Sequence, residues 1–360
     1  MRIVCDAREF VRGRVTGIAR FLSGLVEALA CDEAVEEIIL AVTHRDNVPE
    51  NLIRLEAVIP KTVPGSFIGG EIALSRLTRT GVDCFISPYP KLPLLGTHCP
   101  SIHTVHDVLD LTHSAYRKRY RISWDTYRLK TALATADLTW YDSSYSLQET
   151  EKIIGFSGRN PKVRHFGLNR RFSPEPIEND DAVLAEYGLS PGYVLVIGNG
   201  LPHKNLGLLL QITGSLRRKL VFAGVSKKLQ EFWGSRYPET DAIWLRHVHD
   251  DALPAILRNA FCLAQPSTAE GYGYPPLEAM ACGVPAVISD IPVLTETTGG
   301  CALPADPSAS ESWLQLMHHL EEKAFSDAQV EKGLEWVGPL QGAGGWERHV
   351  ADIKELVQFT

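Results

Sequence analysis

The sequence lacks the features that would anchor it in a membrane or crosslink it with disulfides. No apolar run approaches the roughly 20 residues that a transmembrane helix needs. The seven cysteines are an odd number without a Cys-x-x-Cys pair, and most sit in apolar runs, which indicates buried free thiols in a reducing compartment. Met1 leads directly into an apolar segment, so we expect no signal peptide and a cytoplasmic protein.

Other absences limit the partners. A net charge of −7 gives no general attraction to nucleic acid, so we expect no nucleic-acid partner. No Gly-x-Gly-x-x-Gly fingerprint of a dinucleotide site is present, which argues against a dehydrogenase. No residues cluster at metal-ligand spacing, so we expect no metal and no other cofactor. With 44% hydrophobic and 22% charged residues, the 360-residue chain is long enough for two globular domains.

The most informative stretch predicts a strand, a glycine loop, a helix and a second strand. Residues 260–264 are a short apolar run. Gly271 and Gly273 leave the next backbone open to a ligand, and Pro275-Pro276 suits a first helical turn, where a missing N–H costs little. Gly283 then ends the predicted helix. The loop of such a βαβ unit lies at the carboxyl edge of a parallel sheet, where ligands bind and helix N-termini attract phosphate.

Two carboxylates frame this loop. Glu270 lies within it, and we expect Glu278 in the first helical turn. Carboxylates repel a phosphate unless they have another task, such as accepting hydrogen bonds from sugar hydroxyls. For Glu278 the alternative is that it complements the helix dipole.

A second candidate anion site follows the apolar run at 193–198. The loop Asn199-Gly200 leads to Lys204, and a leucine-rich segment then continues as a predicted helix. A lysine at a helix start is unfavourable for the helix dipole. Lys204 therefore indicates a bound anion.

The first half of the chain offers two further strand ends. The apolar segment 2–5 is followed by a loop with three arginines, and Gly17 opens a helix of 3.6-residue rhythm that includes Arg20. The loop is either an anion-binding edge or solvated surface beside a well-packed helix. His106 and Asp107 directly follow a predicted strand. A lone histidine there is usually a hydrogen-bonded structural residue, and the alternative is a site role.

The one markedly basic stretch spans residues 116–130 and carries aromatic residues on one helical face. Three interpretations stay open: contact with nucleic acid, an interfacial membrane helix, or a packed aromatic face with solvated charges. Immediately downstream, Ser146 with Glu149 fits a helix capping box.

These motifs carry a resemblance to a known family. The segment 266–285 reads Pro-Ser-x-x-Glu-Gly-x-Gly-x-Pro-Pro-Leu-Glu-Ala-Met-Ala-Cys-Gly-x-Pro and resembles the Glu-x7-Glu signature of retaining glycosyltransferases of family 4. Segments around Gly17, His106 and Lys204 are similar to family segments as well, so the resemblance spans nearly the whole chain. The chain departs from the family in lacking the usual proline shortly after Asp107 and the usual arginine before the lysine.

The resemblance implies a fold and a domain division. The fold is α/β with two facing Rossmann-like domains and a deep interdomain cleft, the GT-B architecture. An N-terminal acceptor-side domain spans 1–170 and a C-terminal nucleotide-sugar-binding domain spans 171–340. A helix over 341–360 crosses back to the first domain.

The resemblance also assigns roles to residues. Lys204 would hold the donor diphosphate, Glu278 the donor ribose and Glu270 the hydroxyls of the transferred sugar, with His106 and Asp107 on the sugar and acceptor side. The implied sets are as follows: catalytic Glu270, His106 and Asp107; donor-binding Lys204, Asn199, Gly200, Gly271, Tyr272, Gly273, Tyr274 and Glu278; acceptor-side Gly17 and Arg20.

The implied reaction is metal-independent transfer of a sugar from a nucleotide-sugar donor to a saccharide or lipid-linked saccharide, with retention at the anomeric carbon. The subgroup resembles bacterial mannosyltransferases of surface-polysaccharide assembly, which favours GDP-mannose as donor and leaves UDP-sugars open. It also implies a cytoplasmic enzyme that contacts the inner face of the membrane peripherally. A nucleotide-sugar epimerase on the same fold and a non-catalytic sugar-nucleotide-binding partner are the alternatives.

Overall fold

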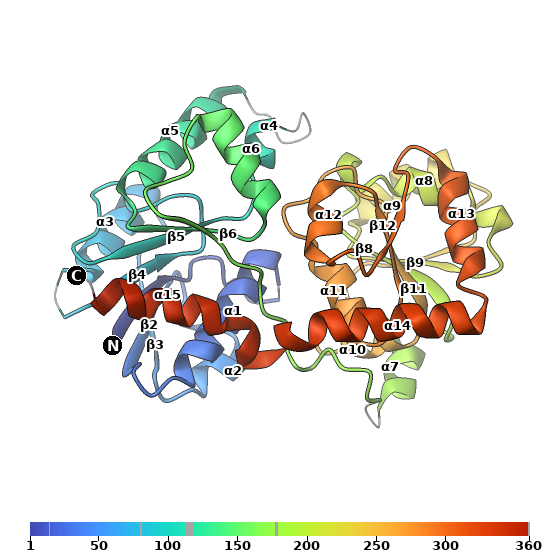
Figure 1. The fold of residues 1–360 in the computed structure, drawn as a ribbon, viewed down its shortest axis with the longest axis horizontal. Coiled ribbons are helices and arrows are strands. Elements are labelled where there is room, and N and C mark those ends of the chain that lie inside the picture. Colours follow the sequence, from blue (N-terminus) through green and yellow to red (C-terminus); the bar gives the residue numbers. More distant parts are fainter. Residues whose placement is uncertain (14, 80, 113–118, 177–178, 359–360) are drawn as a thin grey trace. The chain divides into compact units, whose positions relative to one another are not determined.

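The computed structural model describes residues 1–13, 15–79, 81–112, 119–176 and 179–358, and the side chains of 119–121 are not described. The chain forms two compact units. Unit 1 comprises Met1–Gly167 and Leu340–Thr360, and unit 2 comprises Leu168–Pro339. Figure 1 labels the elements of both.

Unit 1 is built on a parallel sheet with the strand order β3-β2-β1-β4-β5-β6-β7. Its central strands are almost entirely buried, as expected for parallel strands covered on both faces. Chain order reverses direction between β1 and β4, which makes their carboxyl ends the switch point of this sheet. The strands are β1 (Arg2–Asp6), β2 (Glu37–Val42), β3 (Val58–Thr62), β4 (Cys84–Ser87), β5 (Ser101–Val105), β6 (Leu138–Tyr141) and β7 (Pro161–Val163).

The helices of unit 1 begin where capping side chains satisfy backbone N–H groups. Thr16 caps α1 by accepting from the Ala19 N–H at 3.1 Å. Ser143, not Ser146, caps α6, because its hydroxyl accepts from the Ser146 N–H, so the predicted capping box was wrong. The helices are α1 (Gly17–Ala30), η1 (Arg45–Asn47), α2 (Glu50–Ile53), α3 (Phe67–Leu77), α4 (Leu109–Thr112), α5 (Arg119–Thr135), α6 (Ser144–Ile154), η5 (Gly342–Trp346) and α15 (Glu347–Gln358).

Unit 2 repeats the plan with the strand order β10-β9-β8-β11-β12-β13, again parallel. Its switch point lies between β8 and β11. The strands are β8 (Tyr193–Ile197), β9 (Leu220–Ala223), β10 (Ala242–Leu245), β11 (Ala260–Gln265), β12 (Ala286–Ser289) and β13 (Leu303–Ala305). The helices are α7 (Asp180–Glu186), η2 (Pro202–Lys204), α8 (Leu206–Leu210), η3 (Thr213–Ser215), α9 (Lys227–Arg236), α10 (Leu253–Arg258), α11 (Tyr274–Ala281), α12 (Pro292–Thr297), α13 (Ser310–His319), α14 (Lys323–Val337) and η4 (Gly338–Leu340).

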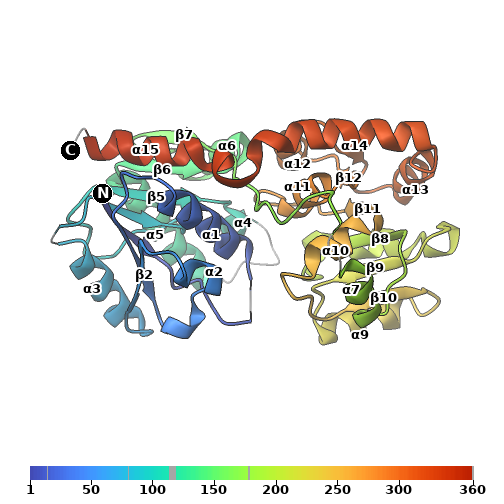
Figure 2. The ribbon, with the colours of Figure 1, turned by 90° about the horizontal axis from the view of Figure 1, so that it is seen from below.

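The last helix, α15, belongs to unit 1 and packs beside α1 (Figure 2). The buried Asp352 accepts from Arg164 at 2.8 Å and from the Trp140 indole at 2.9 Å. His349 lies one turn earlier in an aromatic cluster, with ring centroids 4.8 Å from Trp140 and 5.0 Å from Trp346. A charged anchor and an aromatic cluster therefore fix this C-terminal segment to unit 1.

Two sequence expectations can be compared with the described part of the chain. All seven cysteines are free, and four of them are buried: Cys5, Cys84, Cys262 and Cys282. No helix among the described residues has both the length and the apolar character needed to cross a membrane.

His349 generates a prediction about pH. Burial, partly countered by Asp352, lowers its pKa from 6.5 to about 3, and neither ring nitrogen has a hydrogen-bond partner among the described residues. The depressed pKa leaves stability unaffected above pH 6.5. Stability is lost as pH falls towards 3, because only the unfolded chain takes up the proton.

We therefore expect the unfolding free energy of the wild type to fall by about 2 kcal/mol relative to His349→Phe between pH 7.5 and pH 5. Urea titrations across this range measure it. Taking the difference cancels the titration of Asp142 and His103, which is common to both proteins. The exposed His44 changed to Gln should give no such slope, and parallel pH curves for wild type and His349→Phe would contradict the prediction.

Candidate functional site

The predicted donor residues of unit 2 gather at its switch point, where β8 and β11 end side by side. The loop after β8 carries Lys204, and the loop after β11 carries Glu270. The two loops are joined by their backbones, since the Thr268 N–H donates to the His203 carbonyl at 2.8 Å. Residues 66 positions apart thus form one site.

Lys204 and Glu270 form an ion pair, with Nζ 2.6 Å from Oε1. Both side chains are largely buried, and the Gln265 amide also donates to Glu270. Burial alone would raise the pKa of Glu270, but the Lys204 charge and the hydrogen bonds outweigh it and lower that pKa. The carboxylate is therefore ionised at neutral pH and holds the lysine in place.

Small residues at the end of β8 make room for the lysine. A Cβ on Gly198 would lie 3.4 Å from the Lys204 stem, so the stem packs directly on the glycine. Gly200 has φ +74°, and a Cβ there would meet Val225 at 2.8 Å. Asn199 accepts from the Leu201 N–H at 3.1 Å and so shapes the loop.

Gly273 turns the second loop into α11. Its φ of +99° is left-handed, and a Cβ would lie 2.5 Å from Leu294. Pro275 and Pro276 occupy the second and third positions of α11, which agrees with the predicted first turn. Prolines have no N–H, so Tyr274 is the only one of the first three helical residues with a backbone donor. The first turn of α11 is thus poorer in donors for a phosphate than the sequence suggested.

Glu278 is the fifth residue of α11 and only 1% exposed. The expectation of a place in the first turn was wrong, because the helix begins at Tyr274. Tyr272 and Tyr274 flank Gly273 and contact each other edge to face at 5.4 Å between ring centroids. The Tyr272 carbonyl accepts from the Thr297 hydroxyl at 3.0 Å, which fixes the loop that begins with Gly271.

In unit 1, His106 follows β5 and is held at both ring nitrogens. Nε2 lies 3.0 Å from the Pro88 carbonyl oxygen, and Nδ1 lies 3.3 Å from Asp142 Oδ2. A carbonyl can only accept, so Nε2 donates to Pro88, and Nδ1 faces the Asp142 carboxyl group. Burial raises the pKa of Asp142 to about 7. His106 thereby ties the end of β4 to β6.

The other predicted residues of unit 1 lie directly after His106 and on α1. Asp107 accepts from the Leu109 N–H at 2.8 Å at the start of α4. Gly17 is the exposed first residue of α1, and Arg20 lies on the same helix. The next residue, Phe21, contacts the His106 ring with centroids 5.3 Å apart.

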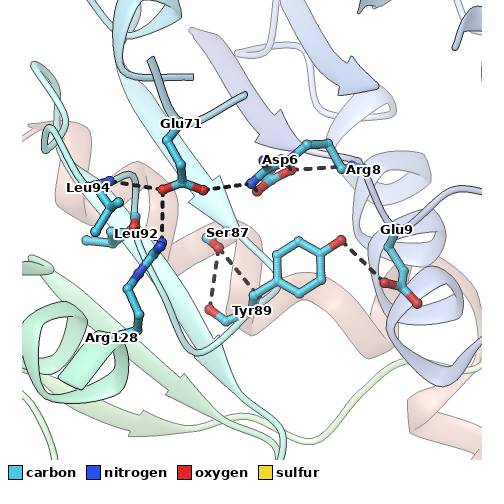
Figure 3. Close-up of polar contacts among 9 residues, drawn as sticks. All are labelled: Asp6, Arg8, Glu9, Glu71, Ser87, Tyr89, Leu92, Leu94 and Arg128. Carbon is cyan, nitrogen blue, oxygen red and sulfur yellow. Dashed lines mark hydrogen bonds and ion pairs between the residues drawn. The ribbon is translucent and has the colours of Figure 1, made fainter. Parts of the chain in front are cut away.

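The switch point of unit 1 holds a charged network that the sequence reasoning missed (Figure 3). Arg8 binds Asp6 through two nitrogens at 2.8 and 2.7 Å and approaches Glu71 at 3.4 Å. Arg128 donates to Glu71 at 2.9 Å and to the Leu92 carbonyl at 2.7 Å. Its members lie far apart in the sequence, and only the position of Arg8 after a strand hinted at it.

Two hydroxyl groups bind Glu9, the residue that follows Arg8. The Tyr89 hydroxyl donates to Glu9 at 3.3 Å (Figure 3), and the Thr16 hydroxyl donates to the other Glu9 oxygen at 2.6 Å. Three segments thus meet at one edge of the sheet: the N-cap of α1, the loop after β4, and the loop after β1 that carries Arg8.

The basic aromatic stretch differs from the packed interpretation. Residues 116–118 lie outside the described residues. Trp124 and Tyr127 stack at 5.7 Å and are 44% and 55% exposed, whereas Arg128 is buried. Burial of Arg128 is possible because the Glu71 carboxylate compensates its charge and the Leu92 carbonyl accepts a further hydrogen bond.

In the described parts of the chain, no group of three His, Cys, Asp or Glu side chains is arranged to hold a metal ion. The charges at both switch points are carried by lysine, arginine and carboxylate side chains.

Residues 185–322 match the family model described as Glycosyl transferases group 1. This match assigns a glycosyltransferase group 1 domain to unit 2, and the two parallel α/β units have the GT-B class of fold.

Three similar proteins support this class. The chain is 25% identical to O-antigen chain mannosyltransferase B of Escherichia coli over 91% of this chain and 93% of that protein. Its fold is similar to that of sucrose-phosphate synthase of Thermosynechococcus elongatus, with a TM-score of 0.79, 16% identity and coverage of 100% and 99%. It is also similar to Anabaena HepE in complex with UDP-glucose, with a TM-score of 0.76, 14% identity and 99% coverage of each chain.

The tight turn at Gly273 can be tested by adding one methyl group. Gly273→Ala forces a left-handed alanine against the fully buried Leu294, so we expect a loss of about 2–4 kcal/mol of unfolding free energy. Gly300→Ala is the matched control, because its φ is +68° but no atom lies within 4 Å of the new Cβ. It should cost only about 1 kcal/mol in the same urea titration. Equal losses would contradict the steric argument.

Proposed function

We propose that the protein is a retaining, metal-independent mannosyltransferase that uses GDP-mannose in bacterial surface-polysaccharide assembly. The acceptor is a saccharide or a lipid-linked saccharide. The observation that carries the proposal is the buried Lys204–Glu270 pair at the switch point of the group 1 domain. The mannose assignment is supported by the similarity to O-antigen chain mannosyltransferase B along most of the chain.

The charges of Lys204 and Glu270 suit the transfer of a sugar from a diphosphate. Breaking the bond between sugar and phosphate develops negative charge on the leaving diphosphate, and Lys204 supplies a fixed positive charge there. Glu270 keeps the ammonium in position and has a second oxygen for a hydroxyl of the transferred sugar. Glu278 binds the donor ribose, and Asn199, Gly200 and the loop 271–274 enclose the nucleotide.

Retention follows from front-face attack, in which the acceptor hydroxyl approaches on the side that the phosphate leaves. The leaving phosphate takes the acceptor's proton, so no enzyme nucleophile is needed. His106 serves as a positioning residue in this scheme, because its nitrogens are already engaged by Pro88 and Asp142. Asp107, Gly17 and Arg20 form the acceptor side.

The first prediction for function concerns Lys204. Lys204→Gln should lower kcat/KM for mannosyl transfer by about 10²–10³, because the leaving diphosphate loses its compensating charge. Lys219→Gln, an exposed lysine of the same unit, should leave the rate unchanged. Transfer is measured with GDP-mannose and polysaccharide fragments, with EDTA present, and the anomeric configuration of the product is read by NMR.

The outcomes separate the alternatives. An inverted product would exclude the retaining mechanism, and EDTA inhibition would exclude metal independence. Transfer from UDP-sugars alone would exclude GDP-mannose. Turnover of donor without acceptor would favour an epimerase, and donor binding without any turnover would favour a non-catalytic partner.

A peripheral membrane contact is supported by an exposed apolar patch on unit 1, which we call the aromatic patch. It consists of Phe67, Ile68, Leu94, Leu95, Trp124 and Tyr127, which are 42–70% exposed. The Phe67 and Trp124 rings contact each other at 6.2 Å, so α3 and α5 share the surface. The loop that carries Leu94 joins it through the Leu94 N–H, which donates to Glu71 on α3 at 3.0 Å. Exposed rings with basic residues in the same helix suit an anionic membrane surface.

The membrane contact can be tested with vesicles. The double variant Ile68→Ser/Leu95→Ser should bind vesicles containing anionic lipid at least about fivefold more weakly than wild type, because it loses buried apolar area. Phe232→Ser, at an exposed phenylalanine of unit 2, is the control. Co-sedimentation measures the bound fraction. Unchanged binding of the double variant would exclude this surface.

A further inference from the structure

Lys91 is a half-buried cation at the switch point of unit 1 that forms no ion pair with any described residue. Its ammonium lies over the Tyr89 ring, 4.8 Å from the centroid, and the side chain is half-buried. No carboxylate among the described residues lies within ion-pair distance of it, and no hydrogen bond engages its Nζ. Burial lowers the pKa of Lys91; the Asp6 carboxylate counters part of this effect, and the positive charges of Arg8 and Arg128 add to it.

The neighbouring carboxylates are already engaged. Both oxygens of Asp6 bind Arg8. Glu71 accepts from Arg8, Arg128 and the Leu94 N–H. The two oxygens of Glu9 accept from the Tyr89 and Thr16 hydroxyls. Lys91 therefore has three N–H donors and a positive charge for which the described protein offers no acceptor.

A partly desolvated charge without a partner is unfavourable unless a ligand compensates it. The position of Lys91 fits this explanation, because it follows β4 at the carboxyl edge where open parallel sheets bind ligands. The same loop carries Leu94 and Leu95 of the aromatic patch. The lysine thus lies three residues before the segment proposed to contact lipid.

We propose that Lys91 binds a phosphate group of the acceptor, with the Tyr89 ring packed against its ammonium. The inference rests on the proposed transferase function and specifies its acceptor class as a phosphate-bearing saccharide. The phosphate comes either from a lipid-linked carrier or from a soluble sugar phosphate. The nearby Asp6–Arg8–Glu71–Arg128 network has two positive and two negative side chains and is therefore neutral.

The test uses inorganic pyrophosphate as the probe and the full chain. GDP at saturating concentration first occupies the Lys204 site, and pyrophosphate binding is then measured by calorimetry. Lys91→Gln should weaken binding at least about tenfold, since a charge-assisted contact is lost. Lys91→Arg should retain it. Equal affinities of wild type and Lys91→Gln would overturn the proposal.

Thermal stability distinguishes a binding lysine from a structural one. Lys91→Gln should leave Tm unchanged or raise it, because it removes an uncompensated charge. Arg128→Gln should lower Tm, because Glu71 then loses a buried cation. An equal loss of Tm in both variants would overturn the binding role.

Two further arms separate the possible sources and failures. Vesicles containing phosphatidic acid, compared with phosphatidylcholine alone, test the lipid source. Weaker binding of Lys91→Gln to the phosphatidic acid vesicles assigns a lipid-linked phosphate, and a loss confined to pyrophosphate assigns a soluble one. If GDP does not bind the wild type, the donor assignment fails. In that case Lys204→Gln removes the unit 2 site in place of GDP. Pyrophosphate binding is then compared with and without Lys91→Gln in this background, and the comparison still tests the role of Lys91.

Discussion

Burial of a carboxylate beside a cation is the interaction on which both sheet edges depend. A buried carboxylate is costly alone, and it stays ionised only when a positive charge and hydrogen-bond donors surround it. Glu270 has Lys204 and Gln265 in unit 2. Glu71 has Arg8 and Arg128 in unit 1. Each pair joins elements that are distant in sequence, so the pairs determine how the loops at each edge are arranged.

The two edges use this interaction differently. In unit 2 the cation is the residue proposed to meet the donor diphosphate, and the carboxylate positions it. In unit 1 the arginines are engaged by Asp6 and Glu71, and Lys91 is the cation left over. The same chemistry thus produces a cation paired with a carboxylate at one switch point, and at the other a neutral network near a lysine that has no ion pair. A transferase that handles two phosphate-bearing substrates would need both.

The helix that carries Glu278 illustrates how local chemistry limits a general rule. Helix N-termini attract phosphate through free N–H groups, but Pro275 and Pro276 remove two such groups from the first turn of α11. Gly273 instead turns the chain sharply, and the loop before it is fixed by the bond from Thr297 to the Tyr272 carbonyl. Charge compensation for a diphosphate therefore depends more on Lys204 than on this helix.

The sequence by itself determined the repeated strand–loop–helix order, the parallel sheets and the loops that follow β5, β8 and β11. These are local properties, because apolar runs, glycines and prolines act on their own neighbourhood. Only the tertiary structure decided that Lys204 pairs with Glu270, that both nitrogens of His106 are engaged, and that Arg128 is buried while Trp124 is exposed. Those outcomes depend on contacts between side chains of different loops and helices, and the spacing of residues along the chain does not predict such long-range contacts.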